Sequence, residues 1–211
     1  IPDVPTMTGD IMYANFSALY WASIALGGYL PSDETFEVGD GIRFWHRYES
    51  AEDDEINEME FTRALLHENE DGSQWWRLEF LVDEEDLAYQ ALIADDGAVE
   101  RIQYLDPGTE AVVMHTPSDE YLWEDYQDEM WTEEELDEFR VGSERVTVPA
   151  GTFRTDRLET TQEGAFYTWW ISDEVPGRVV KFEGTTEDDE RVSGELREIY
   201  TDYRSPWEPA W

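Results

Sequence analysis

The sequence predicts a mainly β protein, in which a curved antiparallel sheet, a half-barrel or a barrel, encloses an N-terminal helix and a short helical insert. Two observations predict this class. Most of the chain alternates apolar and polar residues with a period of two, in about ten short segments separated by turn residues. Two other segments lack this alternation and space their large side chains as helices do. The 211 residues are enough for one large domain with a sizeable core.

The chain begins with a short segment that contains two prolines. Residues 1–10 include Pro2 and Pro5, and this spacing predicts an extended N-terminal arm. The first residue is Ile1 rather than Met, which we interpret as the result of processing. Together these features favour an extracytoplasmic protein.

An uncharged stretch follows the arm. From Ile11 to Ser32 no side chain carries a charge. With Asp10 as the N-cap and Gly27 as the stop signal, we expect a helix at 11–26. Its length of about 24 Å falls short of the roughly 30 Å of a bilayer core, so we predict no transmembrane span in the mature chain.

This helix has one bulky side and one small side. At 100° per residue the large side chains gather on one face, which holds Met12, Tyr13, Phe16, Leu19, Tyr20, Ile24 and Leu26. The other side is an alanine ridge of Ala14, Ala18, Ala22 and Ala25. A helix without a charged face is expected to be covered on both sides. We therefore interpret it as a central core helix or, alternatively, as a helix shared with a second subunit or with lipid.

The period-two segments predict the strands in order. They lie at 41–50, 59–68, 73–82, 86–94, 98–105 and 110–115, and again at 143–151, 152–161, 165–172, 177–184 and 190–203. The third segment is typical, because one face carries Trp76, Leu78, Phe80 and Val82 and the opposite face carries Trp75, Arg77 and Glu79.

A helical insert separates the two groups of strands. Leu122, Tyr126 and Met130 recur at a spacing of four, and Thr132 with Glu135 has the spacing of a capping box. We expect two short helices between 119 and 139. The predicted organisation is thus a single β-rich domain at 11–203, preceded by the arm and followed by a tail at 204–211 that contains proline and tryptophan.

The charge of the chain is extreme. It has 52 acidic and 14 basic residues, a net charge of −38, and Lys181 is the one lysine. Such self-repulsion opposes folding in dilute salt but is screened at about 1 M, where the Debye length is roughly 3 Å. We interpret the protein as salt-adapted; the alternative is an acidic protein with a calcium-rich surface. Without a basic stripe, a nucleic-acid partner is not expected.

No motif predicts catalysis, a metal site or a cofactor. The chain has no Cys, which excludes thiolate chemistry and Cys-ligated metals. His46, His67 and His115 are not in any tight ligand spacing, and the alternation of His46 with Phe44 and Tyr48 favours a packed or a surface strand position over catalysis. The acidic clusters lie between strands, where solvated turns are expected, and none matches an EF-hand loop.

Two tryptophan pairs are the strongest local signal. Trp75-Trp76 and Trp169-Trp170 each lie on a predicted strand, so each pair places one ring on each face of the sheet. One ring of each pair can enter the core. The other is expected in a groove, under another segment or against a partner.

One segment resembles a known family. "VTVPAGTFRTDRLET" followed by "YTWWISDEVPGRVVKFEG" is similar to the lipoprotein carrier and receptor half-barrels of the LolA/LolB type and their uncharacterised relatives. The shared part includes Val148 to Phe153 and Val180-Lys181-Phe182. The resemblance implies a curved sheet whose concave face holds helices and sometimes an acyl chain, without catalytic residues. The N-terminal helix departs from the family pattern, as does the absence of a lipid-attachment Cys.

These observations predict a non-enzymatic envelope or secreted protein that holds an apolar ligand or partner in the concave face of its sheet. The expected lining residues are Phe16, Tyr20, Trp76, Phe80, Trp169 and Phe182. The runner-up is a self-assembling structural subunit, with an interface made by the arm, Ala14, Ala18, Ala22, Trp207 and Trp211. A carboxylate-based hydrolase is the third possibility.

Salt adaptation makes a direct prediction. Because carboxylate repulsion is screened by salt, the melting temperature should rise strongly between about 0.1 M and 2 M KCl, as followed by circular dichroism. A flat or falling curve would contradict salt adaptation. A sharp gain from millimolar calcium alone would point to specific cation sites instead.

Overall fold

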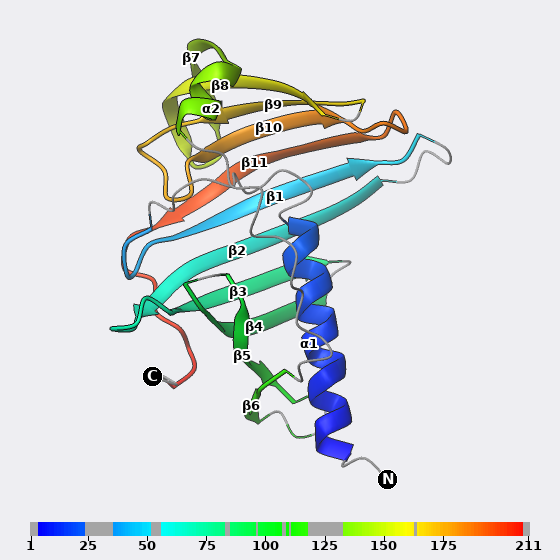
Figure 1. Cartoon of the computed structure of the whole chain (residues 1–211), viewed down its shortest axis with the longest axis vertical. Helices are drawn as coiled ribbons and strands as arrows, with labels where there is room; N and C mark the ends of the chain where they lie inside the picture. The colour runs from blue at the N-terminus through cyan, green and yellow to red at the C-terminus, as the bar shows by residue number, and fades with distance from the viewer. Residues whose placement is uncertain are drawn as a thin grey trace.

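The computed structural model describes residues 4–23, 36–51, 56–82, 85–95, 97–106, 109, 111–117, 133–162 and 164–208. These residues form one curved, unclosed antiparallel sheet of eleven strands, with a helix lying across one face and a short helix at one end (Figure 1). The predicted fold class is confirmed.

The strands match the period-two segments closely. They are β1 (Gly41–Glu49), β2 (Ile56–Glu68), β3 (Gln74–Val82), β4 (Glu85–Ile93), β5 (Val99–Leu105), β6 (Val112–His115), β7 (Arg140–Val148), β8 (Gly151–Gln162), β9 (Ala165–Ile171), β10 (Val179–Thr185) and β11 (Arg191–Tyr200). Their order in the sheet is β6-β5-β4-β3-β2-β1-β11-β10-β9-β8-β7. The sheet therefore consists of two meanders, joined where the first strand pairs with the last.

One face of the sheet carries the core, and we call it the inner face. On β1 the inner residues are Ile42, Phe44 and His46, which alternate with Arg43, Trp45 and Arg47 on the outer face. The same alternation on the other strands gathers the buried side chains into one large cluster that reaches across the sheet from β5 to β7. Period-two patterning thus produces a sheet with one dry face.

A glycine lies at the junction of the two meanders. Gly194 on β11 is paired with His46 on one side and with Phe182 of β10 on the other. A Cβ at this position would lie 2.6 Å from the carbonyl oxygen of Trp45, 2.7 Å from Cε1 of Phe44, and closer than 3 Å to the ring of Phe182. Because Gly194 has no side chain, rings from β1 and β10 meet above β11.

Helix α1 (Val4–Ser23) lies across the inner face beside β6 (Figure 1). The predicted extended arm is wrong over residues 4–10, which are helical, because a proline is tolerated in the first turn, where its missing N–H has no intrahelical partner. Asp10 is accordingly not an N-cap. Its Oδ1 lies 3.0 Å from Nε2 of His115 on β6, and a Cβ at Gly9 would collide with the His115 ring. Helix and sheet therefore touch closely here.

The two sides of α1 differ in burial. Tyr13, Phe16 and Tyr20 on the bulky side are buried against the sheet, as predicted. The expectation that the ridge is also covered within the chain is wrong for Ala14 and Ala18, which are exposed because the helix packs on the sheet through one side alone. The side chain of Ala22 and the predicted end of the helix lie outside the described residues. No described helix is both long and apolar enough to cross a membrane.

The helical insert is described in part. α2 (Glu133–Phe139) confirms the second of the two predicted helices, and Leu136 anchors it in the core. The first predicted helix, around 119–130, lies outside the described residues.

The C-terminal tail covers part of the outer face. Trp75 packs there with Leu66 and Leu92 in a second cluster, and Tyr203 closes over it. Next to this cluster the Arg77 guanidinium lies 4.0 Å from the centroid of the Trp207 ring. The outer member of the first tryptophan pair is thus covered by the tail of its own chain.

Ion pairs cover much of the rest of the outer face. Arg43 contacts Glu198 at 2.9 Å, Arg47 contacts Glu49 at 2.8 Å, and Lys181 contacts Glu183 at 2.6 Å. All six side chains are partly exposed, so each pair contributes little to stability on its own. With 14 basic residues against 52 acidic ones, most carboxylates in the chain cannot have a basic partner.

The close approach of neighbouring groups at Gly194 can be tested by adding one methyl group there. Gly194→Ala should lower the free energy of unfolding by about 1–3 kcal/mol, because the added Cβ collides with backbone and packed rings. Gly142→Ala on β7 is the matched control, since nothing lies within 4 Å of its Cβ position. It should be neutral or slightly stabilising. Equal effects of the two substitutions in urea unfolding at high salt would contradict the close approach at Gly194.

Candidate functional site

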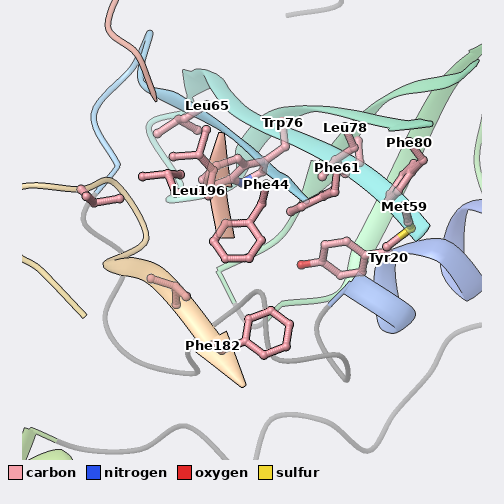
Figure 2. Close-up of a cluster of buried hydrophobic side chains, with 14 of the residues drawn as sticks. Tyr20, Phe44, Met59, Phe61, Leu65, Trp76, Leu78, Phe80, Phe182 and Leu196 are labelled. Carbon is pink, nitrogen blue, oxygen red and sulfur yellow. The ribbon is translucent and has the colours of Figure 1, made fainter. Parts of the chain in front are cut away.

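The structure places all six predicted lining residues in one buried cluster. Phe16 and Tyr20 come from α1, Trp76 and Phe80 from β3, Trp169 from β9 and Phe182 from β10. Figure 2 shows Tyr20 pointing from α1 toward the inner-face side chains of the strands, with Phe182 reaching in from β10. Their role in ligand binding stays a prediction.

A chain of aromatic rings crosses the inner face, and we call it the aromatic row. It runs through His46 (β1), Phe61 (β2), Phe80 (β3), Tyr89 (β4) and Phe16 (α1). Successive ring centroids lie 6.4, 5.5, 6.3 and 5.2 Å apart, within the range of direct aromatic contact. At the β1 end His46 also meets Phe182 at 5.5 Å, and at the helix end Phe16 stacks on Tyr20 at 5.6 Å. The row therefore links both meanders to α1.

The row includes two polar side chains that are fully buried. His46 is 1% exposed, and neither of its ring nitrogens has a hydrogen-bond partner. Burial among apolar rings penalises the charged imidazolium and lowers the pKa of His46 to about 3. The hydroxyl of Tyr89 is also buried without a partner, and burial raises its pKa to about 12. Both groups are thus neutral near pH 7, and their hydrogen-bonding capacity is unused.

A buried cation lies on the same face. Arg63 of β2 is 3% exposed, and its guanidinium lies 4.0 Å from the centroid of the Trp76 ring and 5.4 Å from that of Phe36. Stacking on aromatic faces replaces part of the hydration that a buried guanidinium loses. The inner face is therefore largely aromatic, and His46, Tyr89 and Arg63 are polar side chains embedded in it.

The described residues also line a hollow of about 350 Å³ at the far ends of β9, β10 and β11, away from the aromatic row. Glu49, Glu183, Arg191 and the exposed ring of Phe166 take part in its lining. A carboxylate-based hydrolase would need its two acids in such a place. Both carboxylates, however, are held by basic neighbours two residues away on their own strands, Glu49 by Arg47 and Glu183 by Lys181. This arrangement favours surface ion pairs.

The predicted interface residues are not brought together. Ala14 and Ala18 are exposed on α1, whereas Trp207 contacts Arg77 on the outer face of its own chain. Trp211 lies outside the described residues. A role of these residues in self-association stays a prediction. Among the described residues no group of three or more His, Asp or Glu side chains could hold a metal ion.

The sequence favoured a packed or a surface strand position for His46, and the structure shows it buried. Sequence reasoning did not place Phe61 or Tyr89 in the site, although both are inner residues of period-two segments. It also overlooked Gly194. A glycine inside a strand is a known signal of close approach by a neighbouring group, and this signal was available in the sequence.

The chain was compared with protein-family models, with curated proteins and with solved structures, and the matches are to solved structures. No protein-family model matches the chain. No curated protein matches it either. MucB in complex with MucA(peri) is 14% identical with a TM-score of 0.41, and the match covers 82% of this chain but 60% of MucB.

Two further structures match nearly the whole of their own chains. A protein with a YmcC-like fold from Bacteroides fragilis is 12% identical with a TM-score of 0.35, and the match covers 81% of this chain and 98% of that one. The LolA superfamily protein NE2245 from Nitrosomonas europaea is 7% identical with a TM-score of 0.32, and the match covers 87% of this chain and 94% of that one. One of the structures that this chain matches is thus described as a LolA superfamily protein. At these TM-scores, function has to be argued from the chain's own residues.

The buried His46 predicts a specific pH dependence. Because its pKa is about 3 in the folded state against 6.5 for a free side chain, the unfolded state binds the additional proton between these values. His46 should therefore leave stability unchanged above pH 6.5 and reduce it as pH falls toward 3, by roughly 1.4 kcal/mol per pH unit. His46→Phe should remove this loss, so that its stability advantage over wild type grows by roughly 2 kcal/mol from pH 7 to pH 5.

The measurement is urea unfolding at high salt, with His67→Phe as the matched control at a half-buried position near the end of β2. The advantage of His46→Phe over wild type should grow by more than any change with pH that the control shows. An advantage of His46→Phe that is the same at pH 7 and pH 5 would contradict a neutral, unpartnered histidine in the core.

Proposed function

We propose that the protein is a non-enzymatic carrier or receptor that holds an apolar ligand between the inner face of its sheet and α1. The observation that supports it is the continuity of the aromatic row from β1 across the sheet to Phe16 of α1. Because α1 covers the row through one side alone, movement of the helix would expose the row without breaking the sheet.

The attachment of the helix fits such an opening. At its N-terminal half, α1 touches β6 where the Gly9 backbone lies against the His115 ring and Asp10 reaches Nε2 of the same side chain. Farther along, the contacts of Phe16 and Tyr20 with the row are aromatic. An apolar ligand can replace contacts of this kind, since they depend on shape and burial rather than on a fixed partner.

We propose an extracytoplasmic location, as the sequence resemblance to lipoprotein carriers implies, and a medium of high salt, as the net charge of −38 implies. Self-assembly is the second candidate. It is favoured by the exposed side of α1, where Ile11 is 58% exposed next to Ala14 and Ala18 in a helix that has no charged residue from position 11 to its end.

The proposal can be tested by fixing the helix to the sheet. The chain has no cysteine, so Gly9→Cys with His115→Cys introduces a single disulfide, and the His115 ring that would collide with a Cβ at position 9 is removed. In 2 M KCl, the reduced double variant should bind an environment-sensitive apolar dye saturably. The oxidised form should bind it far more slowly or not at all, and a reductant should restore binding.

The Gly9→Cys single variant is the control, since it cannot form the intramolecular bond. Equal dye binding by oxidised and reduced forms would show that the ligand does not enter between α1 and the sheet. Failure of the reduced form and of wild type to bind the dye would overturn the proposed function. Sedimentation velocity on the same samples reports the subunit number that the second candidate requires.

A further inference from the structure

On the sheet, the aromatic row begins at His46 and ends at Tyr89, and both side chains have buried polar atoms. His46 on β1 has two buried ring nitrogens without partners, and Tyr89 on β4 has a buried hydroxyl without a partner. Leaving a buried polar group unpaired is costly, and most such groups in folded proteins are satisfied. Apolar rings at these two positions could fill the same space at no loss of packing. Packing of the core therefore does not explain why the two side chains are polar.

The chemistry of these groups is specific. A neutral imidazole has one N–H donor and one nitrogen acceptor, and a phenol hydroxyl both donates and accepts. Their surroundings are apolar rings: Phe44, Phe61 and Phe182 around His46, and Phe16 and Phe80 around Tyr89. Such a place stabilises an uncharged oxygen group that can accept or donate a hydrogen bond. It does not stabilise an ion, because a charge there would lose its hydration without gaining a counterion.

The separation of the groups fits an elongated molecule. β1 and β4 are three strand spacings apart, or roughly 14 Å. Between them the inner face offers the rings of Phe61 and Phe80. An extended apolar chain lying along the row would contact these rings and bring its polar groups to the ends.

We propose that the inner face binds a neutral long-chain amphiphile, whose uncharged oxygen groups form hydrogen bonds with His46 and Tyr89. This inference rests on the proposed function and specifies the ligand class. Long-chain alcohols and neutral acylglycerols belong to this class, whereas fatty acid anions and plain alkanes do not.

Charge elsewhere in the molecule agrees with this choice. A protein of net charge −38 repels anionic amphiphiles at a distance in dilute salt. The cation on the inner face, Arg63, is engaged by Trp76 and Phe36 and has further interactions. An anionic ligand that paired with Arg63 would be the alternative, and the experiment includes it.

The experiment compares three ligands of one chain length in displacement of the apolar dye at pH 7.5: 1-dodecanol, dodecane and dodecanoate. High salt, 2 M KCl, screens long-range repulsion, so that the preference reflects the buried site. Wild type should bind dodecanol more tightly than dodecanoate. Because dodecanol has a single hydroxyl and reaches one end of the row at a time, its Kd should rise roughly two- to tenfold in His46→Phe or in Tyr89→Phe, the range expected for one lost hydrogen bond, while the Kd of dodecane stays unchanged in both.

Matched controls are His67→Phe and Tyr203→Phe, which lie outside the aromatic row and should leave all three affinities unchanged. Both test variants replace a buried polar ring with an apolar one, and a melting curve checks that they fold. Tighter binding of dodecanoate than of dodecanol, or equal losses for dodecanol and dodecane, would overturn the inference while the proposed function stands. Absence of binding by all three ligands and the dye would overturn the proposed function itself.

Discussion

The contact between rings of β1 and β10 across Gly194 is the constraint on which the rest of the structure depends. The sheet is made of two meanders, and the pairing of β1 with β11 joins them. Phe44 and Phe182 stack at 5.8 Å above this junction, and His46 packs against both. Because β1 and β11 are about 150 residues apart in sequence, their pairing closes a long loop, and the ring contacts help to offset its entropic cost.

From this junction the aromatic row extends across β2, β3 and β4 to α1, so the same packing that joins the meanders also positions the helix. The outer face has the opposite character. It carries ion pairs within and between strands, and the C-terminal tail, whose Trp207 ring lies against Arg77. The protein therefore separates an aromatic inner face from an acidic exterior. The buried His46 and Tyr89 are exceptions within the inner face, and unsatisfied polar groups in an otherwise apolar core are expected chiefly where function requires them.

The strands could be predicted from the sequence because each has a clear period of two. The same pattern placed Trp76 and Trp169 among the candidates for the concave face, and both are buried there. Sheet order could not be predicted, since no local signal specifies that β1 pairs with β11. The start of α1 was missed because Pro5 was interpreted as a helix breaker rather than as a first-turn residue. The exposure of Ala14 and Ala18 depends on how many layers cover the helix, which is a tertiary property. Among the predicted lining residues, Phe80 and Phe182 lie on strands with a clear inner-face pattern, and both are buried.

The central claim is that rings from both meanders meet over the bare backbone of Gly194. Nuclear Overhauser effects between the Gly194 α-protons and aromatic protons test it most directly, in protein labelled on glycine and phenylalanine. The account predicts strong cross-peaks to the rings of Phe44 and Phe182, together with ring-current shifts of the α-protons, upfield for a proton over a ring face and downfield for one at a ring edge. Absence of cross-peaks, with α-proton shifts typical of an open glycine in a strand, would contradict it.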